Sequence, residues 1–222
     1  MRRLLLSALA LTAASCGGSA APAALDPGPL LAGGVSAMGA VQTARFEMTR
    51  SGAPVTFDGL EFESAVGRYA APASAEAVLL VRVGDIAAEL GTISVGERTW
   101  LTNPATGRWE ELLPGTGFNP AVLFDPSLGW VALLGDLGDV SFVATEGGRH
   151  HLAATVPAAR VEALTAGLAA GQSVPMDLWL DTATGHIVRL EFSTVGEAGS
   201  SDWVITLSGF GESVQIEPPA AG

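Results

Sequence analysis

Side chains that could act as catalysts or metal ligands are few in this sequence, and their spacing keeps them apart. The histidines are His150, His151 and His186, and there is one cysteine. His150 and His151 are adjacent on a predicted strand, where successive side chains point to opposite faces, so the two rings cannot chelate one ion together. His186 follows Gly185 at a predicted turn. This set nearly excludes a structural zinc site, which uses four cysteine or histidine ligands.

The remaining candidates for chemistry are acidic and hydroxyl side chains in predicted loops. Asp136 and Asp139 flank a Leu-Gly pair and could contact a cation, although a solvated loop is the favoured interpretation. The serine-rich segment 199–202 lacks the Gly-x-Ser-x-Gly spacing of a nucleophile elbow and indicates a turn. No glycine-rich phosphate loop follows a predicted strand. We therefore predict no catalytic residue, no metal site and no cofactor, and expect that the protein is not an enzyme.

The cysteine, Cys16, stands behind a short secretion signal. Arg2 and Arg3 give a positive start, and residues 4–14 form an apolar run broken only by one serine and one threonine. A membrane span needs about 20 apolar residues, so this run fits a cleaved signal peptide over residues 1–15. Small residues before the cysteine match a bacterial lipobox, with Ala13 in the place where leucine is usual. Lipidation of Cys16 is predicted; the alternative is an ordinary signal peptide with an incidental cysteine.

The charge of the mature chain restricts its partners. Loss of Arg2 and Arg3 from the 11 basic residues leaves nine against 23 acidic residues, a formal charge of −14. Such a surface repels the phosphates of nucleic acid, so no nucleic-acid partner is expected. It also disfavours adsorption to an anionic membrane. Attachment to the cell membrane, on its extracytoplasmic side, is therefore expected through the acyl chains on Cys16.

Helical and strand periodicities divide the rest of the chain. Helices are predicted over residues 30–42, 118–137 and 157–171. About ten strands with alternating apolar and polar residues lie between and after them, and segment 103–107 ends in glycine as a hairpin turn does. The pattern indicates a strongly curved antiparallel sheet whose one apolar face is covered by the helices. A flexible tether over residues 16–29 would precede a single domain over residues 30–219.

The predicted helices are rich in glycine and alanine, which pack with small side chains against a sheet. A curved sheet covered in this way need not fill its interior, and a cavity lined by large apolar residues would accept acyl chains. A filled core would show the same alternation. Composition does not favour either interpretation, an open cavity or a filled core. From alternation alone, the expected lining residues are Val35, Met38, Phe46, Met48, Leu80, Trp100, Leu123, Leu128, Val131, Leu134, Met176, Leu178, Leu180, Val188, Leu190 and Phe192.

Four segments resemble one family of bacterial envelope lipoproteins. They are residues 95–109, residues 124–129, residues 174–181 with Gly185, and residues 207–218. In this order, and behind a lipobox, they are similar to the LppX/LprA/LprF/LprG family across essentially the whole mature chain. The resemblance implies an α+β fold in which a half-barrel sheet carries helices over its concave face, similar to the LolA/LolB carriers. The family implies no catalytic residues.

The resemblance also implies a function. We expect a lipid-anchored protein that binds the acyl chains of lipids or glycolipids in an apolar cavity and carries them from the cytoplasmic membrane outward. It would act as a monomer, with a membrane transporter as a further partner. One alternative is a non-enzymatic accessory or scaffold lipoprotein with a filled core that assists such a transporter. A hydrolase is disfavoured because no catalytic triad is found.

Overall fold

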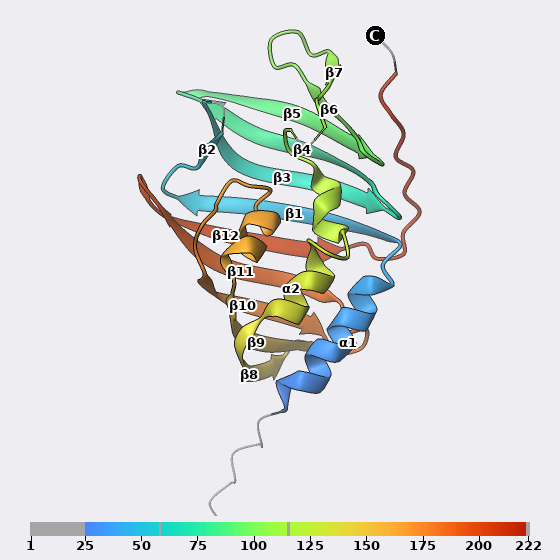
Figure 1. Ribbon diagram of the computed structural model, residues 1–222, viewed down its shortest axis with the longest axis vertical. Coiled ribbons are helices and arrows are strands. Elements are labelled where there is room, and N and C mark those ends of the chain that lie inside the picture. The colour runs from blue at the N-terminus through green and yellow to red at the C-terminus, as the bar shows by residue number, and fades with distance from the viewer. Residues whose placement is uncertain (1–24, 58, 115, 221–222) are drawn as a thin grey trace, which may run out of the picture.

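The computed structural model describes residues 25–220, except residues 58 and 115. Its centre is one antiparallel sheet in the order β7-β6-β5-β4-β3-β1-β12-β11-β10-β9-β8, with β2 paired to β3 (Figure 1). The strands are β1 (Thr43–Gly52), β2 (Thr56–Phe57), β3 (Leu60–Ala70), β4 (Ser74–Val83), β5 (Ile86–Val95), β6 (Arg98–Thr102), β7 (Trp109–Glu111), β8 (Gly138–Glu146), β9 (Arg149–Val156), β10 (Val174–Asp181), β11 (Ile187–Gly196) and β12 (Gly199–Ser208). The sheet is curved and open, and the prediction of an α+β fold with a curved antiparallel sheet is confirmed.

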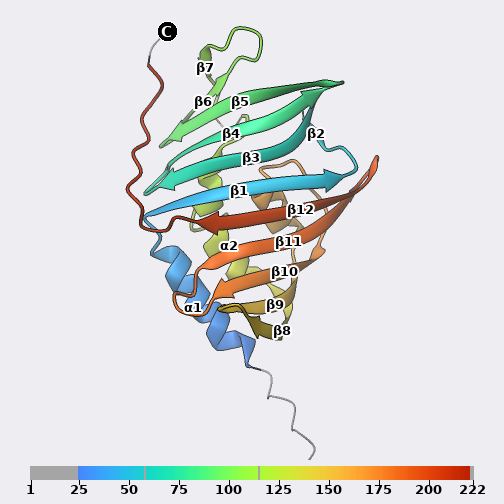
Figure 2. The same ribbon diagram turned by 180° about the vertical axis from the view of Figure 1, so that it is seen from behind.

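Short helices cover the concave face of this sheet. They are α1 (Pro27–Gly39), the 3-10 helix η1 (Pro120–Phe124), α2 (Trp130–Asp136) and α3 (Ala158–Leu164). Figure 1 looks onto the helices, and Figure 2 shows that no helix lies over the convex face. The molecule therefore has two layers, and its core lies between the concave face and the helices.

Alternating residues explain why the sheet has one buried face. In β1, Ala44, Phe46 and Met48 are buried, whereas Arg45 and Glu47 between them are exposed. On the convex face, oppositely charged side chains pair across neighbouring strands, as Arg82 of β4 does with Glu63 of β3. Apolar residues thus face the helices and ion pairs face solvent, which fixes the register of each strand.

The helices differ from their predicted bounds. The first begins at Pro27 rather than at residue 30, because Asp26 caps it by accepting a hydrogen bond from the Gly28 N–H at 2.9 Å. The predicted tether over residues 16–29 is therefore too long at its C-terminal end. The described residues also form 12 strands rather than about ten. The predicted signal peptide, Cys16 and most of the tether lie outside the described residues.

The other two predicted helices are shorter than the periodicity suggested. The predicted helix over residues 118–137 is divided into η1 and α2, because Asp125 before Pro126 is extended and Gly129 starts a new helix. The predicted helix over residues 157–171 ends at Leu164. Ala166 and Gly167 then take positive φ angles of 50° and 83°, which stop an α-helix.

Candidate functional site

Most of the predicted lining residues gather at the interface between the sheet and the helices. Leu178 and Leu190, which pair across β10 and β11, are completely buried there, and Met38 of α1 is 5% exposed. Val35 and Val131 are half-buried against the same cluster. The predicted residues that are buried in the cluster are Met38, Phe46, Met48, Leu123, Leu134, Met176, Leu178, Leu180, Leu190 and Phe192.

Two predicted lining residues face the wrong side of their strands. Val188 lies at an irregularity in β11, where Leu180 pairs with Ile187 and Trp179 pairs with Arg189. This bulge turns Ile187 inward in place of Val188. In β4, Leu79 is 1% exposed and faces the core, so its neighbour Leu80 points to the convex side. The predictions for Val188 and Leu80 are corrected accordingly.

Trp100 and Leu128 also lie outside the cluster. Trp100 alternates in β6 with Thr99 and Leu101, and its ring lies under the Arg98 guanidinium at 4.6 Å. Thr99 faces inward, where its hydroxyl is 3.0 Å from that of Ser94, so Trp100 is on the convex side. Leu128 is 47% exposed because it belongs to the turn before α2 rather than to a helix.

The prediction included Phe192 but omitted the other two members of an aromatic row on the concave face, Phe62 and Trp203. The Trp203 ring of β12 stacks between two others, with centroids 5.8 Å from Phe62 and 6.1 Å from Phe192. Its indole N–H donates to the Thr194 hydroxyl at 2.9 Å, so the polar atom of this buried ring is satisfied. The alternation of β12 carried the signal for Trp203. The other buried cluster residues that were not predicted as lining are Ala65, Ala77, Leu79, Val81, Leu90, Phe118, Trp130, Leu133, Leu152, Val156, Val161, Leu164, Ala169, Val174, Ile187, Ile205 and Leu207.

One glycine on the concave face makes room for an aromatic side chain. A Cβ atom built at Gly67 of β3 would lie 2.3 Å from Cζ of Phe46 and 2.4 Å from the Glu76 carbonyl oxygen. Any larger residue would displace the Phe46 ring from the cluster. The lack of a side chain at Gly67 thus leaves the space that the Phe46 ring occupies on the concave face.

A small hollow of about 200 Å³ opens from the surface into this apolar interface. We call it the mouth. Leu79 of β4 and Phe118 lie at the mouth and belong to the buried cluster. Two loop segments border it, one around Gly117 and one around Gly167. Both glycines have positive φ angles, 75° and 83°. The residues lining the mouth are Phe57, Leu79, Gly117, Phe118, Ala166, Gly167 and Leu168.

A second hollow of about 420 Å³ adjoins the mouth and shares Gly117, Ala166 and Gly167 with it. We call it the vestibule. Its charged lining residues are Glu97 and Glu162, and no arginine or histidine lines it. Polar groups of Thr99, Thr116 and Asn119 and apolar groups such as Val122, Leu128, Ala159 and Ala163 complete its wall. The mouth is therefore apolar, and its approach is polar and acidic.

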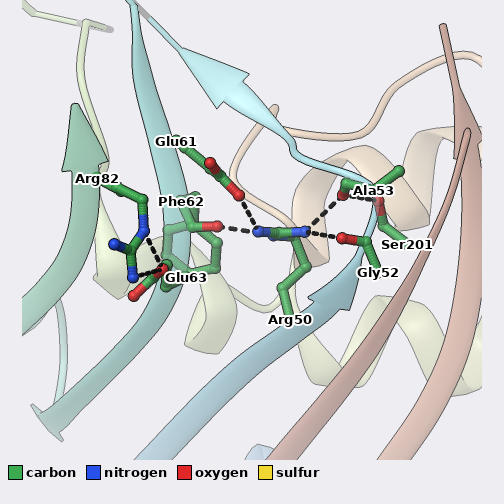
Figure 3. Close-up of polar contacts among 8 residues, drawn as sticks. All are labelled: Arg50, Gly52, Ala53, Glu61, Phe62, Glu63, Arg82 and Ser201. Carbon is green, nitrogen blue, oxygen red and sulfur yellow. Dashed lines mark hydrogen bonds and ion pairs between the residues drawn. The ribbon is translucent and has the colours of Figure 1, made fainter. Parts of the chain in front are cut away.

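A buried arginine fixes one side of the mouth. Residues 53–57, which we call the flap, follow β1 and bring Phe57 to the mouth. The side chain of Arg50 is only 4% exposed, and its Nη2 lies 2.7 Å from the Glu61 carboxylate. Figure 3 shows the guanidinium between this carboxylate and three backbone carbonyls, those of Phe62, Gly52 and Ala53. Arg50 thus ties the flap to the end of the sheet.

Hydrogen bonds order the turn that separates η1 from α2. The Asp125 carboxylate accepts from the Ser127 hydroxyl at 2.6 Å and from the backbone N–H groups of Ser127 and Leu128. These donors, the Ser127 hydroxyl foremost, hold the pKa of Asp125 below its usual value. Burial raises the pKa of the nearby Tyr69 hydroxyl, with a smaller effect from the Asp125 charge. The Tyr69 ring stacks on Phe124 at 4.0 Å and so holds η1 on the sheet.

The side chains considered for catalysis are held in separate contacts. His151 lies 2.7 Å from Asp177 and stacks on Trp179, while His150 lies 2.8 Å from the Thr145 hydroxyl. Asp136 accepts a hydrogen bond from Arg160 at 2.8 Å. In the part of the chain that the structure describes, no three histidine, cysteine or acidic side chains are placed to hold a metal ion. Over the same residues, no helix has the length and apolar character needed to cross a membrane.

Comparison with known families agrees with this architecture. The model of the LppX_LprAFG lipoprotein family matches residues 26–216. The chain therefore belongs to the LppX_LprAFG lipoprotein family, as the sequence motifs indicated. No curated protein sequence matches the chain.

Solved structures show the same fold. The chain is similar to LprF from Mycobacterium bovis, with 18% identity and a TM-score of 0.65 over 87% of this chain and 96% of that one. It is also similar to LppX from Mycobacterium tuberculosis, with 20% identity and a TM-score of 0.57 over 87% of this chain and all of that one. Both likenesses extend over nearly the whole described domain.

Proposed function

We propose that this protein is a lipid-anchored, non-enzymatic lipoprotein that binds the acyl chains of a lipid between its curved sheet and its helices. The observation that carries the proposal is the continuous apolar interface under the helices, which reaches the surface at the mouth. Membership of a lipoprotein family supports attachment through Cys16. In this proposal the domain stands on the extracytoplasmic side of the cell membrane and carries lipid outward.

The energetics suit a carrier. Burial of a 16-carbon chain contributes about 13 kcal/mol, at about 0.8 kcal/mol for each methylene, in a bilayer or in an apolar protein site. Transfer between the two is therefore close to neutral. Small differences in packing or head-group contacts then decide whether the protein loads or releases its lipid.

The mouth is the proposed entrance for the acyl chain. At about 200 Å³ it is smaller than the roughly 300–1,000 Å³ of typical ligand pockets, so chain entry requires displacement of its wall. Apart from Leu79 of β4, that wall consists of the flap, the segment around Gly117 and the turn after α3, which are loop segments or short strands. Movement of such segments leaves the sheet intact, because they contribute little to its strand pairing.

The vestibule would then hold the head group. Its charged lining residues, Glu97 and Glu162, are both acidic, and a phosphate placed there would be repelled. Threonine and asparagine side chains offer hydrogen bonds to hydroxyl groups instead. An uncharged, hydroxyl-bearing head group is therefore the cargo that this geometry favours.

The tether constrains where loading occurs. With the domain starting at Pro27, residues 16–26 can span at most about 40 Å when fully extended. A protein anchored at Cys16 would take lipid from the membrane that anchors it. It would deliver that lipid to a nearby acceptor or to a membrane transporter.

A change at the mouth tests this proposal. Leu168 is half-buried at the mouth, and Leu168→Trp adds volume there. Val66→Trp is the matched control, because Val66 lies on the convex face and is 56% exposed. The exported Cys16→Ser chain with each substitution is purified without detergent, and lipid is extracted and quantified. We expect less bound lipid with Leu168→Trp and no change with Val66→Trp; equal lipid content in both variants would refute the mouth as the entrance.

The accessory-protein alternative rests on a different observation. Core side chains such as Leu178 and Leu190 are completely buried, so the interface is filled in the structure as it stands. A protein that keeps this packing would assist a transporter through its acidic surface and hold no lipid. Absence of extractable lipid from the parent chain would favour that function.

A further inference from the structure

A separate hollow lies on the convex face, on the other side of the sheet from the mouth. It has a volume of about 710 Å³ and is formed at the ends of β10 and β12, the start of β11 and the start of β9. Figure 2 shows these strand ends beside α1. We call it the convex hollow, and nothing in the proposed acyl-chain site uses it.

Two arginines and a histidine line this hollow, in a chain that has few basic residues. Arg149, Arg189 and His186 all contribute to the wall. Among the described residues, Arg149 forms no ion pair and no side-chain hydrogen bond, unlike most arginines of the sheet. Its guanidinium is thus available to an added anion, and guanidinium groups bind phosphate oxygens through paired hydrogen bonds.

Asp181 is the acidic residue that lines the hollow, and no ion pair joins it to Arg149 in the described part of the chain. Asp181 is opposite Arg149 in the pairing of β9 with β10, but its Oδ1 atom accepts hydrogen bonds from within its own turn. These come from the Ala183 N–H at 3.0 Å and from the N–H and hydroxyl of Thr184 at 2.8 and 2.9 Å. Oδ1 of Asp181 is therefore engaged by the turn rather than by Arg149.

The other side of the hollow adds a second guanidinium and two hydroxyl groups. Arg189 donates from Nε to Glu191, and no hydrogen bond from its two Nη atoms is found within the described chain. Thr206 lies opposite Arg189 in β12, and Ser208 follows it at the exposed end of the same strand. Arginine and hydroxyl donors on two sides of one hollow suit an anion with several oxygens, such as a phosphate group.

Stacking fixes the histidine of the hollow. The His186 ring lies 4.1 Å from the Phe210 ring, nearly parallel to it. Burial lowers the pKa of His186, and the Asp181 charge opposes this only in part. A neutral imidazole still offers one N–H donor to an oxyanion.

We propose that the convex hollow is a binding site for a phosphate group, with Arg149 and Arg189 as its main donors. The phosphate can belong to a lipid head group of the anchoring membrane or to a soluble phosphate, since both present the same oxygens. This site is independent of the proposed acyl-chain function. Failure of one leaves the other standing, because they lie on opposite faces of the sheet.

Free phosphate provides the first test, on the exported chain carrying Cys16→Ser. Isothermal titration with inorganic phosphate should show saturable binding, and Arg149→Ala should weaken it by about tenfold or more. Arg108→Ala is the matched control, because its side chain also lacks an ion pair in the described structure and it lies in the distant hairpin after β6. Ser208→Asp, which places a carboxylate at the hollow, should abolish binding. No saturable binding, equal binding by acetate, or equal binding by the Arg149 and Arg108 variants would overturn the proposal.

Vesicles separate the two sources of phosphate. The same Cys16→Ser chains are sedimented with vesicles of phosphatidylglycerol or of phosphatidylcholine. Arg149-dependent binding to phosphatidylglycerol supports a lipid head group as the ligand, and phosphate binding without vesicle binding supports a soluble phosphate. The proposed site would be overturned if the parent chain bound no free phosphate and Arg149→Ala left vesicle binding unchanged.

Discussion

Replacement of Arg50 by methionine should loosen the flap and destabilise the fold. Arg50→Met keeps an apolar stem of similar length but removes the hydrogen bonds to Glu61 and to the carbonyls of Phe62, Gly52 and Ala53. Loss of one partner of a buried ion pair costs about 3–5 kcal/mol. Glu61 remains 30% exposed and can be hydrated, so we expect about 3 kcal/mol.

Urea denaturation of the Cys16→Ser chain measures this effect. With a slope of about 3 kcal/mol per molar urea, a loss of about 3 kcal/mol lowers the midpoint by about 1 M. Arg82→Met is the control, because the Arg82 side chain is 38% exposed in its pair with Glu63 on the adjacent strand, whereas that of Arg50 is 4% exposed (Figure 3). The midpoint of Arg82→Met should match the parent. An unchanged midpoint for Arg50→Met, or an equal fall for Arg82→Met, would refute the role assigned to Arg50.

Two further predictions concern the α2 region and the β10–β11 turn. A Cβ at Gly129 would lie 2.0 Å from the Leu123 carbonyl oxygen, so Gly129→Ala should destabilise the fold by about 1–3 kcal/mol. Gly135 in α2 has open space around it, so Gly135→Ala should raise stability by up to about 1 kcal/mol. Thermal unfolding compares the two, and equal melting temperatures would contradict the packing. The pKa of His186 is lowered on folding, so the unfolded state binds more protons than the folded state just below pH 6.5. The contribution of His186 to the free energy of unfolding is therefore complete above pH 6.5 and declines as the pH falls below it. An NMR titration of the ring should give a midpoint below 6.5; a midpoint above it would show that the ring is not desolvated as described.

Alternation along the strands predicted the sheet and most of the buried site. Met176, Leu178 and Leu180 alternate strictly in β10, and all three are buried. The same rule failed at Val188, because a bulge adds one residue between the inward-facing Ile187 and Leu190 and shifts the alternation at the start of β11. Bulges are set by the pairing of two strands, so periodicity within one strand does not reveal them.

The helices were harder to predict because tertiary contacts decide where they end. Leu164 and Leu168 have helical spacing, yet the Thr165 hydroxyl accepts from the Ala169 N–H at 3.0 Å and stabilises a turn instead. Arg50 could not be recognised as buried from sequence, since it continues the alternation of β1 as a polar residue. Its guanidinium can be buried because backbone carbonyls accept its hydrogen bonds, and these carbonyls come together only in the folded protein.

The most direct test of the central claim is native mass spectrometry of the exported Cys16→Ser chain, purified without detergent. We expect adducts whose masses correspond to acyl lipids, and we expect these adducts to decrease in Leu168→Trp and to persist in Val66→Trp. A single mass equal to that of the bare chain, in parent and variants alike, would contradict acyl-chain binding between the sheet and the helices.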